Sequence, residues 1–123
     1  HLPGMHQVAQ YRAMQLQSNF AHDELDIREA HNYFEYGKYC DNTAFGGTAY
    51  YTSNGTEAIG MQSAGQSRTA DELGYDIACG FRNSPGHWKY LKLSWYKYMA
   101  VGVDWSYAKQ FTTCIMVSSE NYG

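Results

Sequence analysis

Histidine and serine are the side chains of this sequence with the clearest capacity for chemistry. A neutral imidazole is a good ligand for Zn²⁺, and a serine hydroxyl becomes a nucleophile when a base takes its proton. Ser84 lies close to His87, but a Ser-His pair without a third member is incomplete, and Ser-Pro-Gly is typical of a turn. His22 and His87 are far apart in the sequence, so only the fold can bring their imidazoles together. We expect the remaining histidines at the surface: His1, His6 and His31.

The three cysteines form no metal-binding or redox motif. Cys40, Cys79 and Cys114 are widely spaced without a Cys-x-x-Cys pattern, which excludes a zinc ribbon or a thioredoxin-type site. In an oxidising compartment they allow one disulfide and one free thiol. Three buried, apolar thiols are the other interpretation. Cys79 or Cys114 could act as a nucleophile with His87, although no neighbouring feature marks a reactive thiol.

A lysine-rich aromatic segment follows His87. Residues 88–98 hold three lysines and five aromatic residues and no acid. The residues that we expect to form a binding surface are Trp88, Lys89, Tyr90, Trp95 and Tyr96. Such a surface could stack on sugars or contact an anionic surface such as teichoic acid or lipid headgroups. Lysine stems over packed aromatic rings are the other interpretation, and the net charge of −3 argues against nucleic acid as a partner.

The composition indicates one folded domain over residues 1–123. The chain has 123 residues, of which 44% are hydrophobic and 17% charged, which excludes disorder as the default state. We expect no transmembrane segment, because no apolar run is long enough to span a bilayer.

Hydrophobic periodicity predicts the elements that must position these side chains. Helices are predicted over residues 5–20 and 26–36, the first from a stripe formed by Met5, Ala9, Ala13, Leu16 and Phe20. Thr69-x-x-Glu72 is a capping box that starts a third helix, and Pro85-Gly86 is expected to end it. Residues 48–52 are prone to form a strand, and 53–55 a hairpin turn.

The last third of the chain shows the alternation of strands. Apolar residues recur at every second position over residues 98–105 and again over 111–117. The short segment between the two runs predicts an antiparallel hairpin. Helices followed by paired strands indicate the α+β class.

Several motifs, taken in order, resemble those of the CAP superfamily (cysteine-rich secretory, antigen 5 and pathogenesis-related 1 proteins). They are Arg-Asn-Ser-Pro-Gly-His at 82–87, Tyr-Met-Ala-Val-Gly-Val at 98–103, Ala-Gln-Tyr-Arg-Ala at 9–13, Phe-Ala-His-Asp at 20–23, and Thr-Ala-Asp-Glu at 69–72 with Phe81. The Ser-Pro-Gly-His form is most similar to the bacterial branch. The resemblance covers roughly residues 5–118 and implies a three-layer α-β-α sandwich with a mainly antiparallel sheet. It also implies a secreted or cell-surface protein whose export signal precedes the sequence shown. The family's usual first helix is absent from this sequence, which is expected either of a fragment or of a divergent member.

The resemblance further implies a central cleft lined by His22, His87, Glu57 and Ser84. In some family members such histidines hold a divalent metal, so Zn²⁺ or a similar ion is expected on His22 and His87. Glu57 is assigned from the segment that is most similar to the family's Gly-Glu-Asn motif, and the family's second acid falls near Ser84. The expected function is binding of a small molecule, a lipid or a cell-envelope component, without turnover. The alternative is a metal-dependent hydrolase of the peptidase kind with Glu57 as base.

Overall fold

The computed structural model describes residues 3–34, 55–63, 69–92, 96–107 and 110–119. Its elements, in chain order, are α1 (Pro3–Ser18), α2 (Glu24–Tyr33), β1 (Gly55–Ser63), α4 (Ala70–Arg82), α5 (Pro85–Leu91), β2 (Tyr98–Tyr107) and β3 (Gln110–Ser118). Helices together with an antiparallel sheet confirm the predicted α+β class. Within the described ranges, the helices are too short or too polar to cross a membrane.

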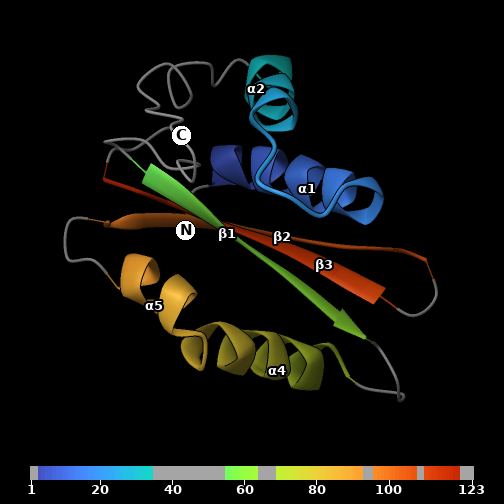
Figure 1. Ribbon diagram of the computed structural model, residues 1–123, viewed down its shortest axis with the longest axis vertical. Helices are drawn as coiled ribbons and strands as arrows, with labels where there is room; N and C mark the ends of the chain where they lie inside the picture. Colours follow the sequence, from blue (N-terminus) through green and yellow to red (C-terminus); the bar gives the residue numbers. More distant parts are fainter. Residues whose placement is uncertain (1–2, 35–54, 64–68, 93–95, 108–109, 120–123) are drawn as a thin grey trace.

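The three strands form one antiparallel sheet with the order β1-β3-β2, so β3 is the central strand. Cys114 of β3 lies opposite Ile59 of β1 and opposite Gly102 of β2. Helices α1 and α2 lie on one side of the sheet, and α4 and α5 lie on the other (Figure 1). Because side chains alternate along a strand, each strand directs every second residue to one of these two sides.

The predicted C-terminal hairpin is confirmed. The alternating runs at 98–105 and 111–117 lie within β2 and β3, which pair in antiparallel register. Thr112, Cys114 and Met116 are buried on the side of α1. The sequence pattern succeeds here because the two strands are neighbours in the chain and their pairing is local.

Helix α1 supplies much of the core. Met5, Ala9, Ala13 and Leu16 are buried, as the predicted stripe requires. The helix ends at Ser18, earlier than predicted, so Phe20 lies beyond it and its side chain is 43% exposed.

Polar contacts fix α1 on the sheet. The Gln10 side chain donates to the Val103 carbonyl (2.6 Å) and accepts from the Val103 N–H (3.1 Å). The Thr112 hydroxyl donates to the Ala13 carbonyl at 2.6 Å. Between these contacts Gly102 faces the backbone of Ala9 so closely that a Cβ would not fit. The helix is therefore held at a separation that a larger residue would not allow.

Helix α2 corrects one sequence prediction. It spans Glu24–Tyr33 and starts earlier than predicted, because the Asp23 carboxylate accepts from the N–H groups of Leu25 (2.9 Å) and Asp26 (3.1 Å) as a cap. The prediction that His31 lies at the surface was wrong, since its exposure is 0%. His31 follows buried Ile27 by one helical turn and so lies on the same inward face. His6 is exposed as predicted, whereas His1 lies outside the described residues.

The capping box at Thr69 is confirmed, since its hydroxyl accepts from the N–H of Glu72 at 3.1 Å. The prediction that Pro85-Gly86 ends this helix was wrong. Helix α4 ends at Arg82 with Asn83 as its cap, and Pro85 begins α5. Proline is well suited to a first helical position because the N–H that it lacks would have no partner there.

Strand β1 was not predicted. The strand expected at 48–52 lies outside the described residues, and Gly55, expected in a turn, is the first residue of β1. Cys40 also lies outside the described part of the chain. Cys79 is a half-buried free thiol and Cys114 a buried one, so these two cysteines are not joined to each other.

Candidate functional site

An ion pair between α1 and β1 lies at the centre of the site. The Arg12 guanidinium donates through Nε to Oε2 of Glu57 (3.0 Å) and through Nη2 to Oε1 (2.8 Å). The two side chains are 0% and 2% exposed, respectively. Two parallel hydrogen bonds of this kind hold a carboxylate in a fixed orientation. Arg12 also donates to the Gln15 side chain and to the Ala21 carbonyl, which ties the pair to the segment after α1.

His22 follows this segment and contacts the same carboxylate. Its Nδ1 is 3.0 Å from Oε1 of Glu57, and its side chain is 21% exposed. A carboxylate is an acceptor, so Glu57 favours the His22 tautomer with its proton on Nδ1. Glu57 thus orients His22, and Arg12 orients Glu57.

The electrostatics of Glu57 follow from its partners. Burial alone would raise the pKa of the carboxyl, but hydrogen bonds from His22 and Arg12 and their positive charges outweigh it and lower the pKa to about 2. The Cys114 thiol lies 3.6 Å from Oε2. Burial and the charge of Glu57 raise the pKa of Cys114, so this thiol stays protonated and is not an activated nucleophile.

We predict that the protein loses stability in acid through Glu57. Its pKa is depressed in the folded state, so its contribution is present above the unfolded value of 4.5 and is lost as the pH falls toward about 2. The full loss amounts to about 3 kcal/mol. Urea unfolding between about pH 6 and pH 3 should show about 2 kcal/mol of this loss, since the rest follows only below pH 3.

The control for this prediction is the exposed Glu29. A Glu29→Gln variant is expected to keep the pH dependence, whereas Glu57→Gln flattens it. Equal stability of the unaltered protein at both ends of this pH range would contradict the prediction.

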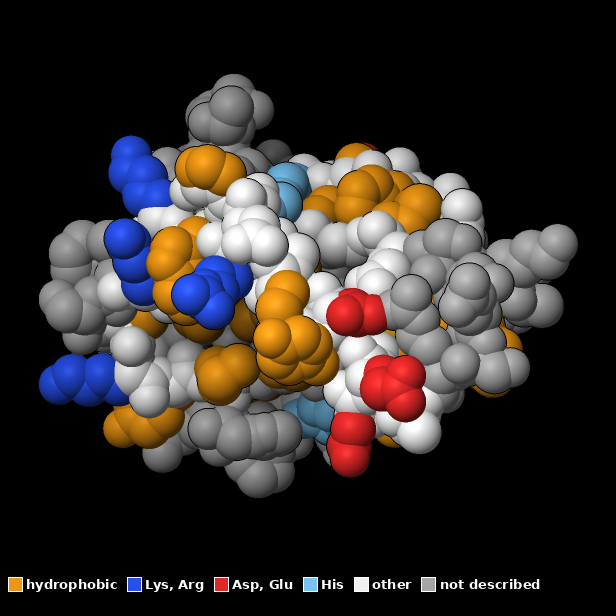
Figure 2. All heavy atoms as spheres, turned by 90° about the horizontal axis from the view of Figure 1, so that it is seen from below, with side chains coloured by type: hydrophobic (Ala, Val, Ile, Leu, Met, Phe, Trp, Pro, Cys, Tyr) orange, Lys and Arg blue, Asp and Glu red, His pale blue; other side chains and the backbone are white. Residues whose placement is uncertain are grey.

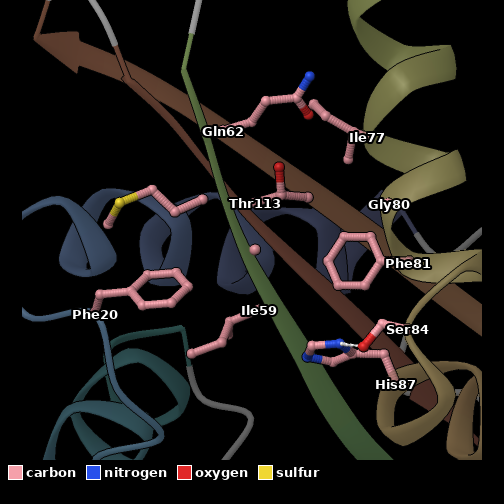
Figure 3. A pocket seen from close by; sticks show the side chains of 11 residues that line it. Phe20, Ile59, Gln62, Ile77, Gly80, Phe81, Ser84, His87 and Thr113 are labelled. Carbon is pink, nitrogen blue, oxygen red and sulfur yellow. Dashed lines mark hydrogen bonds between the residues drawn. The ribbon is translucent and has the colours of Figure 1, made fainter.

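A pocket with a volume of about 340 Å³ lies at the edge strand β1. Its apolar lining comes from Phe20, Ile59, Met61, Ile77 and Phe81. Figure 3 shows Phe20 and Ile59 on one side of β1 and Ile77, Phe81 and His87 on the other. The pocket therefore draws on residues from both sides of the sheet, which meet only where the sheet ends.

A polar pair, Ser84 and His87, forms one end of the pocket (Figure 3). The Ser84 Oγ and the His87 Nδ1 are 2.9 Å apart, and Phe81 meets the imidazole edge-on with ring centroids 5.2 Å apart. Burial lowers the pKa of His87, and the charge of His22 lowers it further, so the His87 ring is neutral near pH 7.

The structure separates the four expected cleft residues into two groups. His87 and Ser84 line the pocket, whereas His22 and Glu57 do not. Both oxygens of Glu57 already accept hydrogen bonds from Arg12, which fits a positioning role better than that of a base. Ser84 has His87 as its partner, a contact that the sequence analysis did not expect, and Cys114 lies with Glu57.

The expected binding surface is partly described. Trp88 and Lys89 are exposed on α5, Tyr90 belongs to the same helix, and Tyr96 is half-buried. Trp95 lies outside the described residues.

Among the described residues, the set of ligands for the metal expected on His22 and His87 is incomplete. In the described ranges, no three or more His, Cys, Asp or Glu side chains form a cluster suited to a metal. Catalytic zinc sites use three protein ligands, and within these ranges the two imidazoles have no third ligand of these types beside them.

Sequence reasoning missed the role of Arg12. It lies one turn after Val8 and one turn before Leu16, at a buried position of the α1 stripe. A charged residue at such a position requires a buried partner, and that requirement could have drawn attention to it. The sequence indicates less clearly that Cys114 lies at this site, because Cys114 is one residue of an alternating strand pattern.

The chain matches no protein-family model, no curated protein and no solved structure. Its family resemblance therefore stays a prediction, and the interpretation of the site rests on the residues described above.

Proposed function

We propose that this protein is a secreted or cell-surface binding module of the CAP type, built as a three-layer α-β-α sandwich. Its ligand is a small molecule, a lipid or a cell-envelope component, held in the pocket beside His87. The observation that carries the proposal is the pocket itself, about 340 Å³ and mainly apolar, with a polar pair at one end. Volumes of this order and a few polar groups in an apolar lining are typical of small-ligand sites.

The lining indicates the chemistry of the ligand. Phe20, Ile59 and Phe81 offer an apolar wall to a hydrocarbon chain or ring. Ser84 and the neutral His87 offer hydrogen bonds to a polar group at one end of it. An amphiphile with one polar end satisfies both requirements.

Filling the pocket from Gly80 is predicted to abolish binding. Gly80 lines the pocket from α4, and a Cβ there meets no atom within 4 Å. A Gly80→Leu side chain can therefore occupy the space of a ligand without displacing the fold. The probe is cis-parinaric acid, a fatty acid whose fluorescence rises in apolar surroundings. We expect its affinity to fall roughly tenfold or more.

The matched control is Gly74→Leu. Gly74 lies on the same helix with nothing within 4 Å of its Cβ position, and it does not line the pocket. This variant is expected to bind the probe as the unaltered protein does. Equal binding by Gly80→Leu and Gly74→Leu would show that the probe lies elsewhere.

The second candidate is a metal-dependent hydrolase that uses His22 and His87. The observation in its favour is that Glu57 fixes Nδ1 of His22, as carboxylates do for metal-binding histidines. The described residues give this pair no third ligand. Calorimetric titration of dialysed protein with Zn²⁺ separates the candidates: one-to-one binding that His22→Ala and His87→Ala each remove supports the hydrolase, and no binding leaves the binding module.

A further inference from the structure

One end of the α4/α5 side is rich in cations. Between Ile77 and Val103 the sequence has no Asp or Glu, but it has Arg82, Lys89, Lys92 and Lys97. All four cationic residues are exposed. Figure 2 shows Lys and Arg side chains gathered with hydrophobic ones at this end, and Asp and Glu toward the other. The charge of this end is thus opposite in sign to the net charge of −3.

Helix α5 places an aromatic ring among these cations. Lys92 follows Trp88 by four residues and Lys89 by three, so on a helix its side chain lies beside both of them. A backbone hydrogen bond from Lys92 N–H to the Trp88 carbonyl (3.1 Å) continues the helical turn to Lys92. His87 points the other way, into the pocket, and Trp88 is 40% exposed.

The start of β2 extends the same surface. Gly102 faces α1, so the residues of opposite parity, such as Met99, face the side of α4 and α5. Lys97 shares this parity and donates its N–H to the Ser118 carbonyl (3.0 Å), which keeps it in line with the strand. Met99 is 42% exposed and Lys97 is exposed. We call the set Trp88, Lys89, Lys92, Lys97 and Met99 the lysine–tryptophan surface.

We propose that the lysine–tryptophan surface docks the protein on an anionic phospholipid bilayer. Lysines contribute attraction to the negative surface potential of such a bilayer. Trp88 and Met99 supply the apolar contacts of an interfacial anchor, since tryptophan favours the headgroup region. A soluble polyanion would use the lysines and leave these two side chains in water. The first turn of α4 contains Asp71 and Glu72 and lies at the end of this side away from α5 (Figure 1), so repulsion tilts the molecule onto its α5 end.

This proposal does not rest on the proposed ligand. Binding to vesicles uses exposed side chains of α5 and β2, whereas the ligand lies inside the pocket. The Gly80→Leu variant is therefore expected to bind vesicles normally even when it binds no cis-parinaric acid.

The experiment is flotation with vesicles of phosphatidylglycerol and, separately, of phosphatidylcholine. We expect binding to phosphatidylglycerol that weakens with added salt, and roughly tenfold or more weaker binding to phosphatidylcholine. A Lys92→Gln/Lys97→Gln variant should lose roughly 30-fold in affinity for phosphatidylglycerol, about fivefold for each lysine. Trp88→Ala should weaken the binding that remains at high salt.

The control is Arg28→Gln, which removes one positive charge from α2 on the other side of the sheet. Arg28→Gln should change the affinity for phosphatidylglycerol vesicles less than twofold, whereas Lys92→Gln alone should lower it roughly fivefold. The proposal is overturned if the protein binds neither vesicle, if it binds both equally, or if Arg28→Gln and Lys92→Gln weaken binding alike. Binding to soluble polyphosphate with none to phosphatidylglycerol would also overturn it, in favour of a polymer partner.

Discussion

An Arg12→Met variant is expected to be about 3–5 kcal/mol less stable than the unaltered protein, because it leaves the Glu57 carboxylate buried without its cation. Both oxygens of that carboxylate accept from Arg12, and both side chains are essentially inaccessible to water. Water cannot replace the guanidinium at such a depth, so the carboxyl must be protonated or the site must open. Urea unfolding followed by circular dichroism measures the difference.

A double variant separates loss of the ion pair from loss of packing. Arg12→Met/Glu57→Leu removes both charges and keeps apolar volume, so it is expected to recover much of the stability. If the free energy of unfolding of Arg12→Met alone lay within about 1 kcal/mol of that of the unaltered protein, the pair would not be buried in solution as described.

The same variant has a consequence for His22. Glu57 contacts Nδ1 of His22 through the oxygen that also accepts from Nη2 of Arg12. Without the guanidinium this oxygen loses one of its two fixed partners, so the ring orientation loosens. The imidazole resonances of His22 in NMR spectra should broaden or shift. Such a change would identify Arg12 as a positioning residue for the site.

Local patterns predicted the parts of the fold that local contacts stabilise. The hairpin of β2 and β3 and the cap at Thr69 each depend on residues that are close in sequence. Strand β1 was missed because its partners in β3 are 47 to 63 residues away along the chain, and because Gly60 and Glu57 interrupt a strand-like composition. Pairing over such a distance leaves little trace in the strand itself.

The contacts of the candidate site also differ in how far the sequence indicated them. Ser84 and His87 are three residues apart, but their contact was not predicted, because Ser-Pro-Gly was interpreted as a turn and the structure has Pro85 at the start of α5. How His22 and His87 lie relative to one another depends on where the segment after α1 and helix α5 lie along β1, which the sequence suggested only through the family resemblance. Arg12 was predicted as part of a helix but not as a partner of Glu57, since a period of 3.6 residues identifies buried positions and not their contacts.

A Gly102→Ala variant is expected to lose about 3 kcal/mol of stability or more, from a single added methyl group. The Cβ would lie under 3.0 Å from backbone atoms of Ala9 and Gln10, a separation that real Cβ atoms essentially never show. A crowded side chain could rotate away, but a helix backbone cannot. Relief requires that α1 move away from β2, which stretches the paired hydrogen bonds between Gln10 and Val103.

Gly74→Ala is the matched control, with the same chemical change at a helical position where nothing lies within 4 Å. It is expected to raise stability by up to ~1 kcal/mol, because alanine favours a helix more than glycine does. The two variants should thus move the urea midpoint in opposite directions. If Gly102→Ala proved as stable as the unaltered protein, α1 would not lie against the sheet as described. The alignment of Arg12 with Glu57, and through it the orientation of His22, would then lose its structural basis.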